Sequence, residues 1–250
     1  MTLIESARLH MRPWLRCVEE SSPAQPVQME AVLRAMLPQR YGVEQGSVFA
    51  AEQSSLRAEG LLIFDALHRL PLGDRHPVEM VYAMCGVSLH MDEAEFDLQL
   101  RMIEQLKRMR REKATAYDVS PLHHLRMFGA RYAQLSDDQI NPLLGYVFAV
   151  DGIDARASID HLNAALQSDA LRAEFSPDAI FCLRGGWMIA RQTRTGELAV
   201  PRSSFGKFGL YEVGEDILTW AYLLLNTALS QIQLKAPDLV KVLQRLPKMP

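Results

Sequence analysis

The sequence predicts an α/β protein with a mixed central sheet that helices cover on both faces. Short apolar runs alternate with segments whose apolar residues recur every three or four positions, which is the pattern of buried strands between amphipathic helices. The two clearest strands cover 61–65 and 80–89, and turn-forming residues bound both. Because both runs are apolar throughout, we expect them in the middle of the sheet, buried on each face.

The chain before these strands predicts two helices and a further strand. Residues 1–25 are expected to form a helical segment and a linker rich in serine and proline, ahead of a single domain over 26–250. An apolar stripe predicts a helix over 27–37, which carries Glu30 and ends before a proline. Residues 41–46 are expected to form a turn and 47–51 a strand.

The clearest helix follows the second central strand and covers 92–113. Asp92 can cap its first turn, and Glu95, three residues on, can reach back to the cap. Acidic residues gather at its start and basic residues at its end, which matches the helix dipole. The apolar stripe of this helix consists of Phe96, Leu100, Ile103, Leu106 and Met109.

The second half of the chain repeats the alternation with weaker patterns. Strands are expected over 146–150, 179–183 and 187–190, and a helix over 159–171. The segment 114–140 is ambiguous and can hold an edge strand. A helix over 215–232 is apolar almost all round, so its surface is buried either by the chain itself or by a second copy in a homodimer.

Composition excludes several classes of protein. The chain has 250 residues, of which 48% are hydrophobic, and a net charge of -3, which argues against binding nucleic acid or an anionic membrane by bulk electrostatics. Cys17, Cys85 and Cys182 lie far apart and form no Cys-x-x-Cys pair, so they indicate neither a zinc site nor a disulfide framework. No apolar run approaches the ~20 residues of a membrane span, and a cytoplasmic protein is expected.

Three segments carry a family resemblance: LPQRYGVEQGSVF at 37–49, SSLRAEGLLIFD at 54–65 and HPVEMVYAMCGVSL at 76–89. In this order they resemble an uncharacterised bacterial family of the PD-(D/E)XK superfamily. The similarity is close over 28–110 and loose over 145–232. It implies a restriction-endonuclease-like fold, which is a mixed central sheet flanked by helices.

The resemblance also implies where a nuclease site would lie. In active members, an Asp on one central strand and the Glu of an E-x-K motif on the next bind Mg²⁺, while the Lys steadies the attacking water. Aligned by the flanking residues, these positions hold Gly60, Gly86 and Ser88. The implied protein is a catalytically inactive pseudo-nuclease without metal or other cofactor, which binds a protein partner in phage defence or as an immunity-type protein.

An alternative is a metal-dependent DNA endonuclease with a relocated acidic site. Glu59 lies one residue from Gly60, and in a regular strand it would face the opposite side of the sheet unless a β-bulge turned it. Asp65 ends the same strand, and His90 follows the second one. These three residues are the candidates for such a rescue.

A segment near the C-terminal third combines basic and aromatic residues. Its basic members are Arg191, Arg194, Arg202 and Lys207, and Phe205 lies among them. Such a mixture suits stacking on bases or contacts to a protein, so nucleic acid is a possible partner. The simpler interpretation is the solvated tip of a β-hairpin. We find no G-x-S-x-G, Walker or dinucleotide-binding pattern.

Overall fold

The computed structural model describes residues 2–22, 27–50, 53–69, 72–109, 111, 143–152, 154–199, 206–232 and 234, and of 53–55, 57–59 and 68 it describes the backbone alone. Within these residues eight strands form one sheet, in the order β3-β1-β2-β4-β5-β6-β7-β8. The strands are β1 (Tyr41–Ala50), β2 (Gln53–Asp65), β3 (Arg75–Pro77), β4 (Val81–Met91), β5 (Leu144–Gly152), β6 (Ala179–Cys182), β7 (Trp187–Gln192) and β8 (Lys207–Glu212).

The sheet is mixed, as the sequence predicts. The pairs β1–β2, β2–β4, β6–β7 and β7–β8 are antiparallel, whereas β1–β3, β4–β5 and β5–β6 are parallel. Each parallel step from β4 to β6 crosses over through a helical segment, as parallel strands require. The order places β2 and β4, the two strands predicted to be central, beside each other within the sheet.

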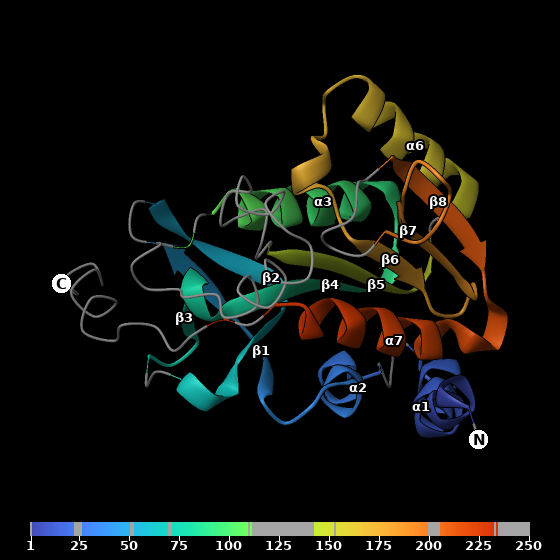
Figure 1. The fold of residues 1–250 in the computed structure, drawn as a ribbon, viewed down its shortest axis with the longest axis horizontal. Helices are drawn as coiled ribbons and strands as arrows, with labels where there is room; N and C mark the ends of the chain where they lie inside the picture. The colour runs from blue at the N-terminus through green and yellow to red at the C-terminus, as the bar shows by residue number, and fades with distance from the viewer. Residues whose placement is uncertain are drawn as a thin grey trace, which may run out of the picture.

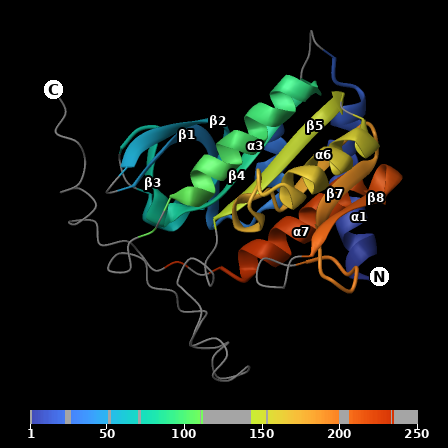
Figure 2. The ribbon, with the colours of Figure 1, turned by 90° about the horizontal axis from the view of Figure 1, so that it is seen from above.

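Helices cover both faces of this sheet (Figure 1). The helices α3 (Glu93–Arg108) and α6 (Ala155–Gln167) lie on one face, and α1 (Leu3–Glu19), α2 (Met29–Met36) and α7 (Ile217–Ser230) lie on the other. Seen from above, α3 runs along β4 and β5 (Figure 2). Short 3-10 turns fill connections at Ala66–His68, Val78–Met80, Ala173–Phe175 and Gly214–Asp216. The predicted α/β class with helices on both faces is confirmed.

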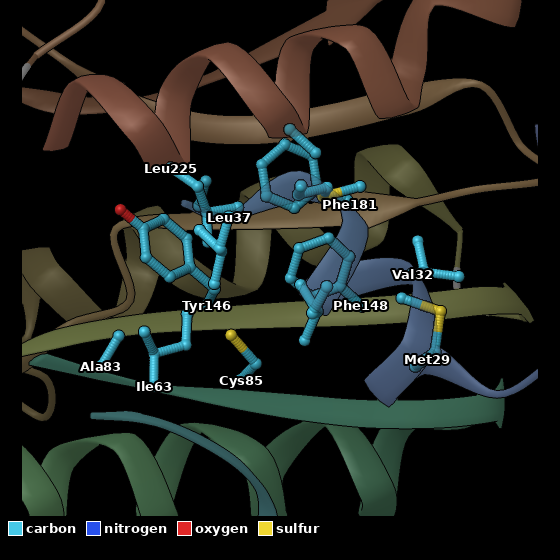
Figure 3. Packing of buried hydrophobic residues seen from close by; sticks show 14 of the residues in the cluster. Met29, Val32, Leu37, Ile63, Ala83, Cys85, Tyr146, Phe148, Phe181 and Leu225 are labelled. Carbon is cyan, nitrogen blue, oxygen red and sulfur yellow. The ribbon is translucent and has the colours of Figure 1, made fainter. Parts of the chain in front are cut away.

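Two apolar clusters hold these layers together, one on each face of the sheet. Beneath α7, the rings of Phe148 and Phe181 stack with their centroids 5.0 Å apart, and Tyr146 lies alongside them (Figure 3). On the other face, Leu62 and Met84 are buried with the apolar stripe of α3. Strands β2 and β4 are therefore apolar on both faces, which explains their unbroken apolar sequence.

The predicted turn at 41–46 is wrong, because β1 begins at Tyr41 and pairs with the whole C-terminal half of β2. Gly42 suggested a turn, but here it is a packing residue. A Cβ on Gly42 would overlap Cζ of Phe64 and lie 2.6 Å from its Cε2, so only glycine leaves room for that ring.

Other element bounds shift for local reasons. The helix predicted over 92–113 ends at Arg108, because Met109 adopts an extended conformation. The helix predicted over 159–171 begins earlier, at Ala155, because Asp154 caps it by accepting a hydrogen bond from the Ala157 amide at 2.8 Å. Strand β8 was not predicted. The possible edge strand in 114–140 lies outside the described residues.

Helix α7 is buried largely by its own chain. Met11 and Val18 of α1 belong to the same cluster as Leu225 and Ala221 of α7, and α1 lies across α7 in Figure 1. The N-terminal helical segment thus covers a surface that the sequence left open to a second copy. In the part of the chain that the structure describes, no helix is long and apolar enough to span a membrane.

Candidate functional site

Gly60 and Gly86, here called the glycine pair, lie side by side on neighbouring strands. Strands β2 and β4 pair antiparallel with Leu61 opposite Cys85 and Leu62 opposite Met84, which brings Gly60 to Gly86. A Cβ on Gly60 would lie 3.2 Å from the Cα of Gly86 and would overlap the carbonyl oxygen of Cys85. The two strands therefore approach each other here more closely than a side chain at position 60 would allow.

Within the glycine pair, Gly86 faces helix α3, where a Cβ on it would meet the side chain of Gln99. Side chains alternate along a strand, and Leu62 and Met84, two residues from each glycine, pack in the cluster beneath α3. Ser88 lies two residues beyond Gly86 on β4, on the same side of the strand, and is half-buried. The three positions that the resemblance aligns with a nuclease site thus lie close together on β2 and β4, and Gly86 among them lies under α3.

Gln99 of α3 fills the space over Gly86. A Cβ on Gly86 would lie 2.8 Å from the Cδ of Gln99 and would overlap its Oε1. The Gln99 side chain is only 2% exposed, and its Nε2 donates a 2.7 Å hydrogen bond to Oε1 of Glu95, one helical turn earlier. Among the described residues its own Oε1 has no hydrogen-bond partner. Sequence reasoning missed Gln99, although a polar residue between Phe96 and Ile103 on the buried stripe was a signal.

Strand β2 contains a β-bulge next to the glycine pair. Its register against β1 shifts between Gln45 opposite Leu61 and Ser47 opposite Arg57. Residues 58–60 of β2 therefore face a single residue of β1, Gly46. This segment includes Glu59, whose backbone alone is described. A bulge is the feature that would allow the Glu59 side chain to leave the regular alternation of the strand.

Asp65 lies at the far end of β2 from the glycine pair. It is five residues from Gly60, which is roughly 16 Å along an extended strand. Its side chain is 6% exposed and accepts a 3.0 Å hydrogen bond from the amide of Leu67, which caps the short turn after the strand. The structure therefore gives Asp65 a local structural partner and does not bring it to Gly86.

His90 pairs with a residue that the sequence analysis did not single out. Its Nδ1 donates a 2.7 Å hydrogen bond to Oδ1 of Asp151, and Arg184 contacts the other carboxylate oxygen at 3.1 Å. The hydrogen bond from His90, followed by that from Arg184, lowers the pKa of Asp151. Strands β4 and β5 are parallel, so their carboxyl ends meet at one edge, and this alignment brings His90 to Asp151. The His90 side chain remains 76% exposed.

The basic segment divides into one inward and two outward side chains. Arg191 of β7 is 12% exposed, and its guanidinium donates to the carbonyls of Pro177 at 3.0 Å and Ser176 at 2.9 Å. Arg194 and Lys207 are exposed around the β7–β8 hairpin. Arg202 and Phe205 lie outside the described residues. Among the described basic residues of this segment, Arg194 and Lys207 present their charge to solvent and Arg191 does not.

The described side chains around the glycine pair do not form a site for a divalent cation, and the side chain of Glu59 is not among them. Among the described residues, no three His, Cys, Asp or Glu side chains converge on a possible metal position. Mg²⁺ requires oxygen ligands around a hydrated space. At Gly86 that space is taken by the amide of Gln99.

Comparisons with known proteins give structural matches only. No family model and no curated protein matches the chain. NucC of P. aeruginosa ATCC27853 in its cAAA-bound form superposes with a TM-score of 0.65 at 14% identity, over 98% of both chains. The cAAA-bound NucC of E. coli MS115-1 gives 0.63 at 13% identity over 98% of this chain and 96% of that one, and its apo form gives 0.58 at 13% identity over 92% of each.

The fold is the restriction-endonuclease-like fold of NucC. The alignments span nearly the whole of each chain, so the match includes the helices on both faces as well as the sheet. At this level of identity the match establishes the fold, and the chemistry of the site has to be argued from the residues of this chain.

Proposed function

We propose that this protein is a catalytically inactive nuclease-fold protein of phage defence, which acts by binding. Its structural neighbour NucC is a phage-defence nuclease of the same fold. The observation that carries the proposal is the glycine pair under Gln99, where the resemblance requires two carboxylates. Glycine offers no side-chain ligand, and the hydroxyl of Ser88 cannot supply the positive charge of a lysine.

The charge at the C-terminal end of β4, where α3 begins, favours a protein partner over nucleic acid at this edge of the sheet. Asp92, Glu93 and Glu95 begin α3 directly after the strand that carries Gly86. Asp151 adds a further carboxylate at the end of β5, although His90 and Arg184 pair with it. Phosphate groups are repelled by such a cluster. A protein surface with basic residues matches it better, as expected of an immunity-type or regulatory partner.

A cleavage assay tests the loss of activity. Purified protein is incubated with double-stranded DNA and with Mg²⁺ or Mn²⁺, and the products are resolved by gel electrophoresis. We expect no cation-dependent cutting above a buffer control. Cutting that requires the cation and disappears in Glu59→Ala would overturn the proposal.

The alternative function is a metal-dependent DNA endonuclease with a relocated acidic site. The specific observation in its favour is the bulge over 58–60, because a bulge can turn Glu59 out of the regular alternation. A comparison of Glu59→Ala with Asp65→Ala shows which of the two carboxylates such a relocated site would use. Since Asp65 lies roughly 16 Å from the glycine pair along β2, Asp65→Ala serves as the matched control that should leave any such activity unchanged.

A binding assay addresses the class of partner. Two of the NucC structures carry cAAA, so cyclic nucleotides join DNA and the product of the adjacent gene as ligands to test. We expect co-purification with a protein encoded next to this one and weak retention of DNA in a gel shift. Tight DNA binding that Arg194→Glu weakens would instead favour a nucleic-acid partner.

A further inference from the structure

Two glycines of the sheet allow helix α3 to lie close to it. Gly86 of β4 lies under Gln99, and Gly145 of β5 lies under Ile103, one turn further along the helix. A Cβ on Gly145 would lie 3.1 Å from Cγ1 of Ile103 and would overlap its Cγ2. At both positions the helix side chain occupies the volume that a strand side chain would otherwise fill.

The Gln99 contact differs from the Ile103 contact in its polarity. Ile103 places a methyl group on Gly145, whereas Gln99 places on Gly86 an amide oxygen that has no hydrogen-bond partner in the part of the chain that the structure describes. A buried acceptor of this kind costs free energy that an apolar side chain would not. The amide also has little freedom to move, because its side chain is 2% exposed and Glu95 holds its Nε2.

We propose that Gln99 closes the site. Position 86 lacks the carboxylate that would bind a metal ion, and the side chain of Gln99 also fills the space that this carboxylate would need. This inference rests on the proposed function, since it explains how the site of an inactive nuclease fold is shut. It also states a requirement on this chain: glycine at position 86 and glutamine at position 99 depend on each other.

The closure has a direct consequence for attempts to restore the nuclease motif. Gly86→Glu places its Cβ on the Gln99 amide, so the new carboxylate has no room while Gln99 is present. Gly60→Asp meets a harder obstacle, because its Cβ overlaps the main chain of β4 rather than a movable side chain. Restoring single residues of the motif therefore disrupts this part of the sheet before it can rebuild a cation site.

A double-mutant cycle tests the dependence. Gly86→Ala and Gln99→Ala are made singly and together, and the urea midpoint of unfolding is measured for each. We expect either single change to lower the midpoint, and Gln99→Ala to raise the midpoint of the Gly86→Ala variant. The same cycle is run with Gly86→Glu, whose midpoint Gln99→Ala should also raise.

Gly145→Ala is the matched control, because it meets the same helix through Ile103 instead of Gln99. Gln99→Ala should leave the loss caused by Gly145→Ala uncorrected. The inference would be overturned if the changes in midpoint caused by Gly86→Ala and Gln99→Ala simply add. It would also be overturned if Gln99→Ala raises the midpoints of the Gly86→Ala and Gly145→Ala variants equally.

Titration of the unchanged protein with Mn²⁺, followed by the electron paramagnetic resonance signal of the free ion, separates this inference from the proposed function. We expect no binding. Binding that Gln99→Ala abolishes would overturn the closure, since Gln99 would then be a ligand. Binding that survives Gln99→Ala and is lost in Glu59→Ala would overturn the proposed function, while the cycle still decides the closure.

Discussion

A buried ion pair anchors the far end of α3, and its titration gives a prediction for stability. Nζ of Lys107, in the last turn of the helix, lies 2.7 Å from Oδ2 of Asp178 and 2.7 Å from the carbonyl oxygen of Ser176. The Lys107 side chain is only 4% exposed. Burial lowers its pKa from 10.5 to about 8, although Asp178 acts in the opposite direction.

The lowered pKa fixes the sign of the pH dependence. Between about pH 8 and 10.5 the folded protein has released the Lys107 proton and the unfolded chain still binds it. The free energy of unfolding therefore rises with pH across this window, and this contribution is lost as the pH falls through 8. A shift of this size corresponds to about 3 kcal/mol over the whole window. Groups that burial keeps protonated oppose this rise. The unfolded chain releases the thiol protons of Cys85 and Cys182 above about pH 9 and its tyrosine protons above about pH 10, because burial raises the pKa of both thiols and raises the pKa of Tyr82 to about 12.

Urea unfolding between pH 7 and pH 10 measures this effect. We expect the free energy of unfolding of the unchanged protein, measured relative to that of Lys107→Met, to increase from pH 8 to pH 9.5, because the thiols and tyrosines contribute equally to both proteins. Arg108→Met is the control, because Arg108 pairs with Glu104 at the exposed side of the same turn. A difference between the unchanged protein and Lys107→Met that stays constant or falls over this range would refute the assigned cause.

Three further predictions concern the elements around the site. Asp92→Ala removes the cap that accepts a 2.8 Å hydrogen bond from the Glu95 amide, and we expect thermal unfolding to show a loss of about 1 kcal/mol. The side-chain amide of Asn163 hydrogen-bonds the main chain of Phe208 in β8. Asn163→Ala removes these bonds and leaves the edge of the sheet more open, so we expect self-association, measured by light scattering, to increase. Arg191→Met should lower the unfolding midpoint, because it removes buried bonds to carbonyls; no change would mean that these bonds contribute nothing.

Elements with strong local patterns were predictable from the sequence. Helix α3 was found together with its cap, because capping and the arrangement of charges depend on residues within a few positions of each other. The turn predicted at 41–46 failed for the opposite reason. Gly42 is small because Phe64, twenty-two residues later, packs on it across β1 and β2. A sequence window cannot distinguish this glycine from one that a turn requires.

The same limit applies to the candidate site. The resemblance identified Gly60 and Gly86, because their flanking residues are similar to family motifs. It did not identify Gln99 or Asp151. Gln99 meets Gly86 through the packing of α3 on β4, and Asp151 meets His90 through the pairing of β4 with β5. The bulge beside Glu59 arises because residues 58–60 of β2 lie opposite a single residue of β1, and no single residue in either strand predicts it.

The distance between α3 and the sheet links the lost motif to the stability of the fold. A helix can approach a sheet closely only where the facing residues are small, and Gly86 and Gly145 supply two such positions under α3. A carboxylate at position 86 requires room for a cation and its water, which would hold the helix away from the sheet at that point. With glycine there, Gln99 descends onto the strand and the volume becomes packed core. The Oε1 of Gln99 has no hydrogen-bond partner among the described residues, which distinguishes this arrangement from an ordinary apolar core. Packing alone would favour methionine or leucine at position 99.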